Sequence, residues 1–201
     1  EAPQLWLSTS GTTTDNNTPS ATWEDFDVMS FTEPDLTFGD NTTSGFFNNE
    51  YSLDEDIRAM HHVNSPTTVQ TGGGSPYDLQ QGQVVLTFRN SVSLSGPGGS
   101  NFTADNKDIV VYTPWTGEYE LLLDDQFSAD IHALSIVEQQ VTIGVDTVLL
   151  EGTWLIAHSG GSVRDNVYTY VGATAIESPL LLLNGSDPQF GLNDSQIQGL
   201  E

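Results

Sequence analysis

The chain has 201 residues, of which 28 are acidic and 4 are basic, so its formal net charge at pH 7 is −24. This charge excludes nucleic acid and anionic membranes as partners, because binding to phosphate needs clustered lysine and arginine. Cysteine is absent, which excludes disulfides and thiolate metal sites, and no apolar run approaches the roughly 20 residues that span a bilayer.

Short runs of Val, Ile, Thr, Tyr, Phe and Leu, separated by Gly, Asn, Asp, Ser and Pro, predict β-strands along the whole chain. No window has the apolar period of about 3.6 residues that marks a helix. We therefore expect an all-β fold of about twelve strands. In chain order the predicted strands are 4–8, 26–31, 46–53, 56–60, 83–88, 109–113, 119–123, 131–137, 147–150, 166–170, 180–183 and 196–200.

Three motifs recur along the chain, which indicates a repeat architecture. The clearest copy reads Asp108-Ile-Val-Val-Tyr-Thr-Pro, then Gly117-Glu-Tyr-Glu-Leu-Leu-Leu-Asp-Asp, then Asp130-Ile-His-Ala-Leu. An earlier copy contains Asp56-Ile-Arg-Ala-Met, and the last one ends in Gln196-Ile-Gln-Gly-Leu. The recurrence predicts one domain of three four-stranded repeats over 1–201, with units at about 56–124 and 130–183 and a third unit split between 195–201 and 4–53.

The split unit places one predicted strand at each end of the chain. Each of these strands is an open edge until it finds a partner. Pairing within a molecule closes the domain, whereas pairing between molecules propagates into filaments when the rotation does not close. The residues expected to carry this pairing are Gln4, Leu5, Trp6 and Leu7 at one end and Gln196, Ile197, Gln198 and Leu200 at the other.

The pattern D-I-V-x-Y-T-P, G-x-Y-x-L-x-x-D and D-I-x-A-L across residues 82–138 resembles the blade repeat of secreted bacterial and archaeal β-propeller-like proteins. In the last copy, Gln196 and Gly199 replace the Asp and the Ala. The resemblance implies a small propeller-like fold closed by the two terminal strands. Propellers usually carry about 4 to 8 blades, so a β-prism, a β-trefoil and a six-bladed ring of two chains remain alternatives.

Two insertions, 12–22 and 63–81, interrupt the repeat pattern. Loops of this length in a compact domain are usually flexible or functional. We expect surface loops there, either flexible or used for recognition or subunit contact.

Acidic residues gather near two predicted turns, with Asp105 and Asp108 at one and Asp124, Asp125 and Asp130 at the other. Calcium takes about 6 to 8 oxygen ligands, and turns supply carboxylates and carbonyls together. Aspartate is also favoured in turns through hydrogen bonds to its own backbone. The five residues are therefore either a calcium site or turn residues, and calcium is the one candidate cofactor.

The histidines and aromatic residues give few site candidates. His61 and His62 are adjacent and point to opposite faces of a strand, so the sequence offers no spaced pair for zinc. His158 begins a glycine-rich turn, His158-Ser-Gly-Gly-Ser. Trp115 lies in a predicted turn that would expose it, which makes it the candidate for sugar stacking.

The chain opens Glu1-Ala2-Pro3 without a methionine, as a processed, exported polypeptide does, so we expect an extracellular or cell-surface location. Candidate glycosylation acceptors lie at Asn41, Asn101, Asn184 and Asn193. The sequence contains no recognisable catalytic constellation. These observations favour a non-catalytic structural subunit of a cell-surface or filamentous assembly, acting through edge strands and loops. The alternative is a calcium-assisted glycan-binding module, so the expected partners are other copies, surface proteins or glycans.

Overall fold

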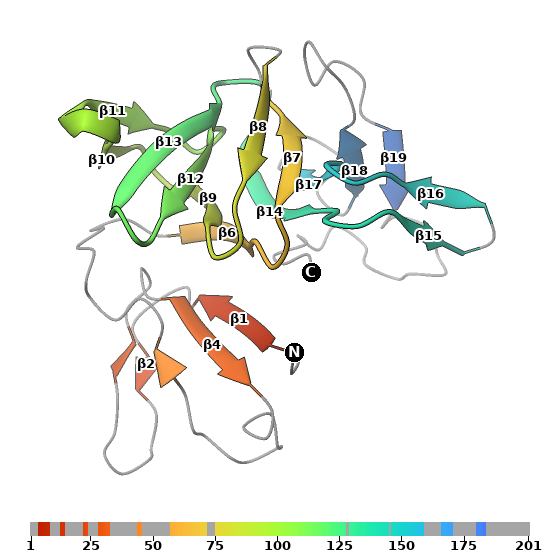
Figure 1. Ribbon diagram of the computed structural model, residues 1–201, viewed down its shortest axis with the longest axis horizontal. Coiled ribbons are helices and arrows are strands. Elements are labelled where there is room, and N and C mark those ends of the chain that lie inside the picture. The colour runs from red at the N-terminus through yellow and green to blue at the C-terminus, as the bar shows by residue number, and fades with distance from the viewer. Residues whose placement is uncertain are drawn as a thin grey trace. The chain divides into compact units, whose positions relative to one another are not determined.

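The computed structural model describes eleven ranges of the chain, which contain nineteen strands and one turn of 3₁₀ helix, η1 (Pro97–Gly99), so the all-β prediction is confirmed (Figure 1). The chain divides into two compact units, Glu1–Ile57 and Arg58–Glu201. Within the described ranges no helix has the length and apolar character that crossing a bilayer requires. These ranges are 4–8, 13–14, 22–23, 28–32, 44–45, 57–71, 75–127, 129–144, 146–158, 166–170 and 180–183.

The first unit contains a small antiparallel sheet with the strand order β1-β4-β5. It consists of β1 (Gln4–Ser8), β4 (Val28–Thr32) and β5 (Ser44–Gly45). A separate pair, β2 (Thr13–Thr14) and β3 (Thr22–Trp23), lies within the first predicted insertion and just beyond it. β1 is an edge strand of its sheet, and its predicted partner at 196–200 lies outside the described residues.

The second unit contains two four-stranded antiparallel sheets, of which the first has the order β13-β12-β9-β6. Every residue of β9 is buried, as expected for a strand inside a sheet with both faces covered, and all of its residues except Thr87 are apolar. Gly117, with φ of 73°, makes the tight turn between the last two strands, since positive φ favours glycine. The strands are β6 (Ile57–His62), β9 (Val84–Phe88), β12 (Ile109–Thr113) and β13 (Glu118–Leu123).

The second four-stranded sheet has the order β14-β17-β18-β19. Its members are β14 (Ile131–Ile136), β17 (Trp154–His158), β18 (Val167–Tyr170) and β19 (Leu180–Leu183). The prediction that 147–150 forms its second strand is wrong. That run pairs instead with a neighbouring segment in a separate hairpin, and the buried strand is β17, which begins at Trp154.

Both sheets carry a hairpin inserted between their first and second strands (Figure 1). In the first sheet the hairpin is β7 (Thr67–Gln70) with β8 (Pro76–Leu79). In the second it is β15 (Val141–Ile143) with β16 (Thr147–Leu149). The first sheet has one further hairpin, β10 (Val92–Ser95) with β11 (Asn101–Ala104), between its second and third strands.

The chain leaves each inserted hairpin through the same backbone turn. In the first sheet Gly82 N–H donates to the carbonyl of Val63 at 2.8 Å, and Val63 N–H donates to the carbonyl of Gln83 at 2.9 Å. In the second sheet Gly152 N–H donates to the carbonyl of Val137 at 2.8 Å, and Val137 N–H donates to that of Thr153 at 3.0 Å. The two sheets are therefore two copies of one unit, which we call the first and second repeats.

The two repeats share one hydrophobic core. Residues of the first hairpin, including Val69 and Leu79, are fully buried in the same cluster as Trp154 and Ile156 of the second repeat. The prediction of a surface loop at 63–81, flexible or used for recognition or subunit contact, is wrong in its structure for most of that length, because Thr67–Gln70 and Pro76–Leu79 form a hairpin with a buried apolar face. Burial of this face joins two segments far apart in the sequence.

Candidate functional site

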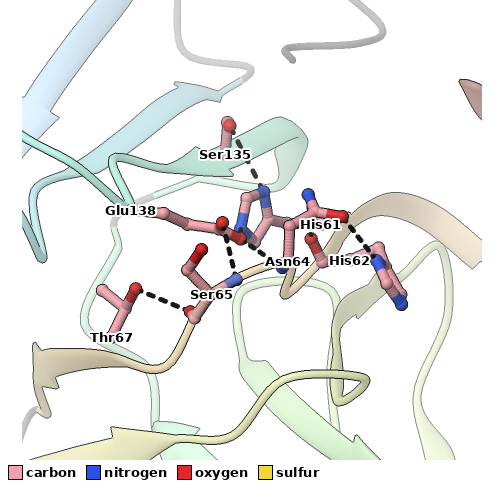
Figure 2. A network of polar contacts seen from close by, with 7 residues as sticks. All are labelled: His61, His62, Asn64, Ser65, Thr67, Ser135 and Glu138. Atoms are coloured by element: carbon pink, nitrogen blue, oxygen red, sulfur yellow. Dashed lines mark hydrogen bonds and ion pairs between the residues drawn. The ribbon is translucent and has the colours of Figure 1, made fainter. Parts of the chain in front are cut away.

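The first strands of the two repeats, β6 and β14, bring a group of polar side chains together (Figure 2). Ala59, His61 and Val63 are buried at alternating positions, so the strand register directs His61 inward. Ser135 is buried in β14, and Glu138 lies two residues beyond the end of that strand. The shared backbone turn makes Ser135 the repeat counterpart of His61, and Glu138 the counterpart of Asn64.

His61 bridges the two other side chains. Its Nε2 lies 3.1 Å from Oε1 of Glu138, and its Nδ1 lies 3.4 Å from Oγ of Ser135. Because an ionised carboxylate only accepts hydrogen bonds, Nε2 carries the hydrogen of the first bond. The side chains of His61 and Glu138 are 7% and 14% exposed, so this contact is shielded from solvent.

Glu138 also holds the backbone that follows β6. Oε1 accepts the N–H of Asn64 at 2.7 Å, and Oε2 accepts the N–H of Ser65 at 2.9 Å. With His61, three donors of the first repeat end on one carboxylate of the second. We call His61, Asn64, Ser65, Ser135 and Glu138 the inter-repeat clamp.

The ionisation of Glu138 reflects two opposing causes. Burial is the largest and would raise its pKa, because it disfavours the charged form. The hydrogen bonds from His61, Asn64 and Ser65 favour the charged form and together outweigh burial, so the pKa of Glu138 is lowered. The clamp therefore holds a carboxylate at neutral pH.

An ion pair also joins the two repeats, between β6 and the residue that precedes β14. Nη1 of Arg58 lies 3.0 Å from Oδ2 of Asp130, with side chains 20% and 35% exposed. This pair is more exposed than the contact between His61 and Glu138, so salt screens it more strongly.

The order Ser135, His61 and Glu138 has the residue types of a nucleophile, a base and an orienting acid. A nucleophile must be reachable, and Ser135 is buried near the end of β14. Both oxygens of Glu138 are occupied by backbone donors as well as by His61. The geometry suits a connection between the repeats better than an acyl transfer.

The structure brings three of the five predicted calcium ligands together around one buried carboxylate. Oδ2 of Asp108 accepts the N–H of Asp105, and its Oδ1 accepts the N–H of Asp125, each at 2.8 Å. Burial, the largest cause, raises the pKa of Asp108. These bonds are turn chemistry, in which backbone donors occupy both oxygens of the central residue.

The other two predicted ligands make no hydrogen bond to Asp108 in the described residues. Asp124 is exposed and follows β13, and its charge lies near enough to help raise the pKa of Asp108 after burial, the largest cause, whereas Asp130 pairs with Arg58. In the part of the chain that the structure describes, no group of three or more His, Cys, Asp or Glu side chains is arranged to hold a metal ion.

Trp115 lies in the turn between β12 and β13 and is 60% exposed, as the sequence predicted. Its Cζ3 atom lies 3.6 Å from the position that a Cβ would take on Gly82. Asn101 is exposed at the start of β11. The remaining candidate acceptors, Asn41, Asn184 and Asn193, and the predicted assembly residues Gln196, Ile197, Gln198 and Leu200 lie outside the described residues.

Of the other histidines, His62 lies beside the clamp and His158 lies in the second repeat. His62 contacts Asn64, with 3.2 Å between Nδ1 and Oδ1, and burial is the main cause that lowers its pKa. His158 stacks on Tyr168 at a ring separation of 5.3 Å, and burial lowers its pKa as well. His61 and His62 serve different contacts, as expected for neighbours on opposite faces of a strand.

Comparison of the chain with protein-family models, with curated proteins and with solved structures finds no match.

Proposed function

We propose that the chain is a non-catalytic, extracellular structural subunit, built from propeller-like repeats whose hairpins and edge strands carry its contacts. The observation that carries the proposal is how the two repeats are joined. Nε1 of Trp154, at the start of β17, donates to the carbonyl of Gln70 in the first hairpin at 3.1 Å. A hairpin of one repeat thus docks on the second strand of the next, which is a contact that can be repeated.

The inter-repeat clamp supports the propeller-like part of the proposal. It joins His61 to its counterpart Ser135, and the backbone of Asn64 to its counterpart Glu138. When two repeats are related by a rotation, counterpart residues come close together only near the rotation axis. The innermost strands of propeller blades lie at such an axis. The third repeat of this proposal contains β1 and β4 and is completed by pairing between β1 and residues 196–200.

The function proposed for the clamp and hairpins is mechanical and not catalytic. Ser135 is buried and Glu138 is occupied by backbone donors, so neither is placed to meet a substrate. The net charge of −24 keeps copies apart at low ionic strength, and salt screens that repulsion. Assembly is therefore expected to strengthen as salt is raised.

The alternative proposal, a calcium-assisted glycan-binding module, has one observation in its favour. Trp115 presents an indole that is 60% exposed, and exposed aromatic rings can stack on sugars. In this reading the ligand lies over the turn between β12 and β13.

Size-exclusion chromatography with light scattering, followed by negative-stain imaging, separates the two functions. A structural subunit forms oligomers or filaments whose mass rises with protein and salt concentration. A chain that stays monomeric under all these conditions and binds a glycan array only with calcium would establish the alternative instead.

A further inference from the structure

The first repeat shows how an inserted hairpin is used. The face of β7 and β8 that carries Thr67, Val69 and Leu79 is almost completely buried, at 3%, 0% and 0% exposed. It packs in the core shared with the second repeat. The opposite face, with Thr68 and Asp78, is exposed.

A glycine in the second repeat makes room for this docking. Gly152 has φ of 78°, and a Cβ there would collide with the carbonyl oxygen of Thr68. The backbone of the first hairpin therefore lies directly on the turn that leads into β17. A side chain at Gly152 would push the two repeats apart.

The second repeat has the same hairpin, but two of the three residues on its equivalent face, Val141 and Ile143, are exposed, while Leu149 is buried at 5%. The pair Val141 and Leu149 is the counterpart of Thr67 and Leu79, as the strand registers and the shared turn establish. Ile143 corresponds to Val69 in the same way. Val141 and Ile143 are 45% and 43% exposed, whereas their counterparts are buried.

The first repeat has the counterpart of the docking glycine, and there an indole lies where the second repeat receives a hairpin backbone. Gly82 has φ of 88° and the same turn as Gly152, but the atom found within 4 Å of its Cβ position is Cζ3 of Trp115. The indole is itself 60% exposed. In the part of the chain that the structure describes, the pair of repeats thus ends in a hairpin with exposed apolar residues on one side and a docking turn next to an exposed indole on the other.

We propose that these two surfaces bind each other between copies, so that the β15–β16 hairpin of one molecule docks on Gly82 and Trp115 of a second copy. This contact rests on the proposed function as a structural subunit, and it specifies which two surfaces would join the copies. The contact is heterologous, since two different surfaces meet, and it closes into a ring or extends into a filament. Val141 and Ile143 provide the apolar face, and Trp115 is the aromatic residue against which it packs.

Two variants remove one surface each, and a third is a matched control. Ile143→Asp places a charge on the docking face, and Trp115→Asp removes the indole from the acceptor. Val148→Asp makes a similar change on the opposite face of the same hairpin, where Val148 is exposed and the first hairpin already has Asp78. Far-UV circular dichroism checks the fold, and Ile143→Ser replaces the aspartate variant where that variant does not fold.

The measurement is sedimentation velocity in about 1 M NaCl, where the Debye length falls to about 3 Å. Wild type and Val148→Asp should assemble alike. The apparent dissociation constant of the other two variants should rise roughly tenfold or more, because burying an unpaired charge in an apolar contact costs at least that much affinity. An equimolar mixture of Ile143→Asp and Trp115→Asp retains one intact pair of surfaces and should form a dimer that does not grow.

The outcomes separate this contact from the proposed function. If wild type assembles but the mixture stays monomeric, or if both single variants assemble like wild type, the contact is refuted and the structural function stands. If wild type is monomeric at every salt and protein concentration, both fail, and the hairpin face is covered within its own chain.

Discussion

Replacing Glu138 with glutamine tests whether the clamp holds the two repeats together. The substitution preserves shape but converts one acceptor oxygen into an amide donor. Of the three donors that end on Glu138, at least one must then face another donor inside a site where the Glu138 side chain is only 14% exposed. A buried donor without a partner costs about 1–3 kcal/mol.

The remaining bonds also weaken, because hydrogen bonds to a charged group are about twice as strong as neutral ones. Adding roughly 1 kcal/mol for this loss gives a decrease of about 2–4 kcal/mol in the free energy of unfolding. For a chain of this size that corresponds to a fall in Tm of about 4–16 °C. Thermal and urea unfolding, monitored by circular dichroism and tryptophan fluorescence, measure this loss of stability.

The pH dependence of the same variant adds a second check. Since the pKa of Glu138 is lowered in the folded state, its contribution is present above the ordinary value of 4.5 and is lost as the pH falls through the lower folded value. The gap between wild type and Glu138→Gln should therefore be full at pH 7 and should close in acid.

The matched control for this test is Glu151→Gln, which neutralises an exposed carboxylate in a turn of the second repeat. Exposed substitutions of this kind usually change stability by about 0.5 kcal/mol or less. If Glu138→Gln behaves like the control, or if its effect is the same at pH 3 and pH 7, the reasoning about the clamp is wrong.

Three further substitutions test other parts of the structure. Gly152→Ala should lower the free energy of unfolding in urea by about 3 kcal/mol or more, because the alanine would have positive φ and its Cβ would collide with the Thr68 carbonyl. Gly144→Ala, with φ of 64° and open space around its Cβ, should lower it by about 1–2 kcal/mol. Equal losses in the two variants would contradict the docking geometry. Burial lowers the pKa of His158 in the folded state, so below pH 6.5 the unfolded chain binds a proton more readily there and the wild-type protein loses stability. His158→Gln should therefore flatten the decrease in the free energy of unfolding below pH 6.5, and an unchanged slope between pH 7 and pH 5 would contradict this prediction. Asp108→Asn should cost about 1–3 kcal/mol, because an amide offers one acceptor where Asp105 and Asp125 need two. Burial raises the pKa of Asp108 above its ordinary value of 3.8, so the Asp108 side chain stabilises the fold most below pH 3.8 and this stabilisation is lost as the pH rises through the folded pKa. The stability lost in Asp108→Asn should therefore be larger in acid than at pH 7, and a loss that shrinks in acid would refute this account.

The sequence predicted the strands that are buried on both faces. Val84–Phe88 and Ile109–Thr113 coincide with β9 and β12, because continuous apolar runs between turn residues correspond to strands inside a sheet. The same reasoning failed at 147–150, where the run is equally apolar. There Leu149 is buried while Val148 is exposed, so hydrophobicity alone could not separate a core strand from a hairpin with an exposed apolar face.

The clamp could not be predicted because it depends on register and not on a local motif. His61 and Glu138 are 77 positions apart, and each is an ordinary polar residue in its own segment. The aspartate group shows the opposite case. Its members are near each other in sequence and do meet, but backbone N–H groups occupy the oxygens of Asp108, which residue types alone do not reveal.

Contact between counterpart positions also explains why the two repeats differ there. Glu138 accepts the backbone N–H of Asn64, which holds the same place in the first repeat, so this position acts through its side chain in one repeat and through its backbone in the other. At the other pair of counterparts, the imidazole of His61 meets the small hydroxyl of Ser135, where two imidazoles would crowd. A junction built from equivalent positions thus uses unequal residues, and the repeat signal is weak where the repeats touch.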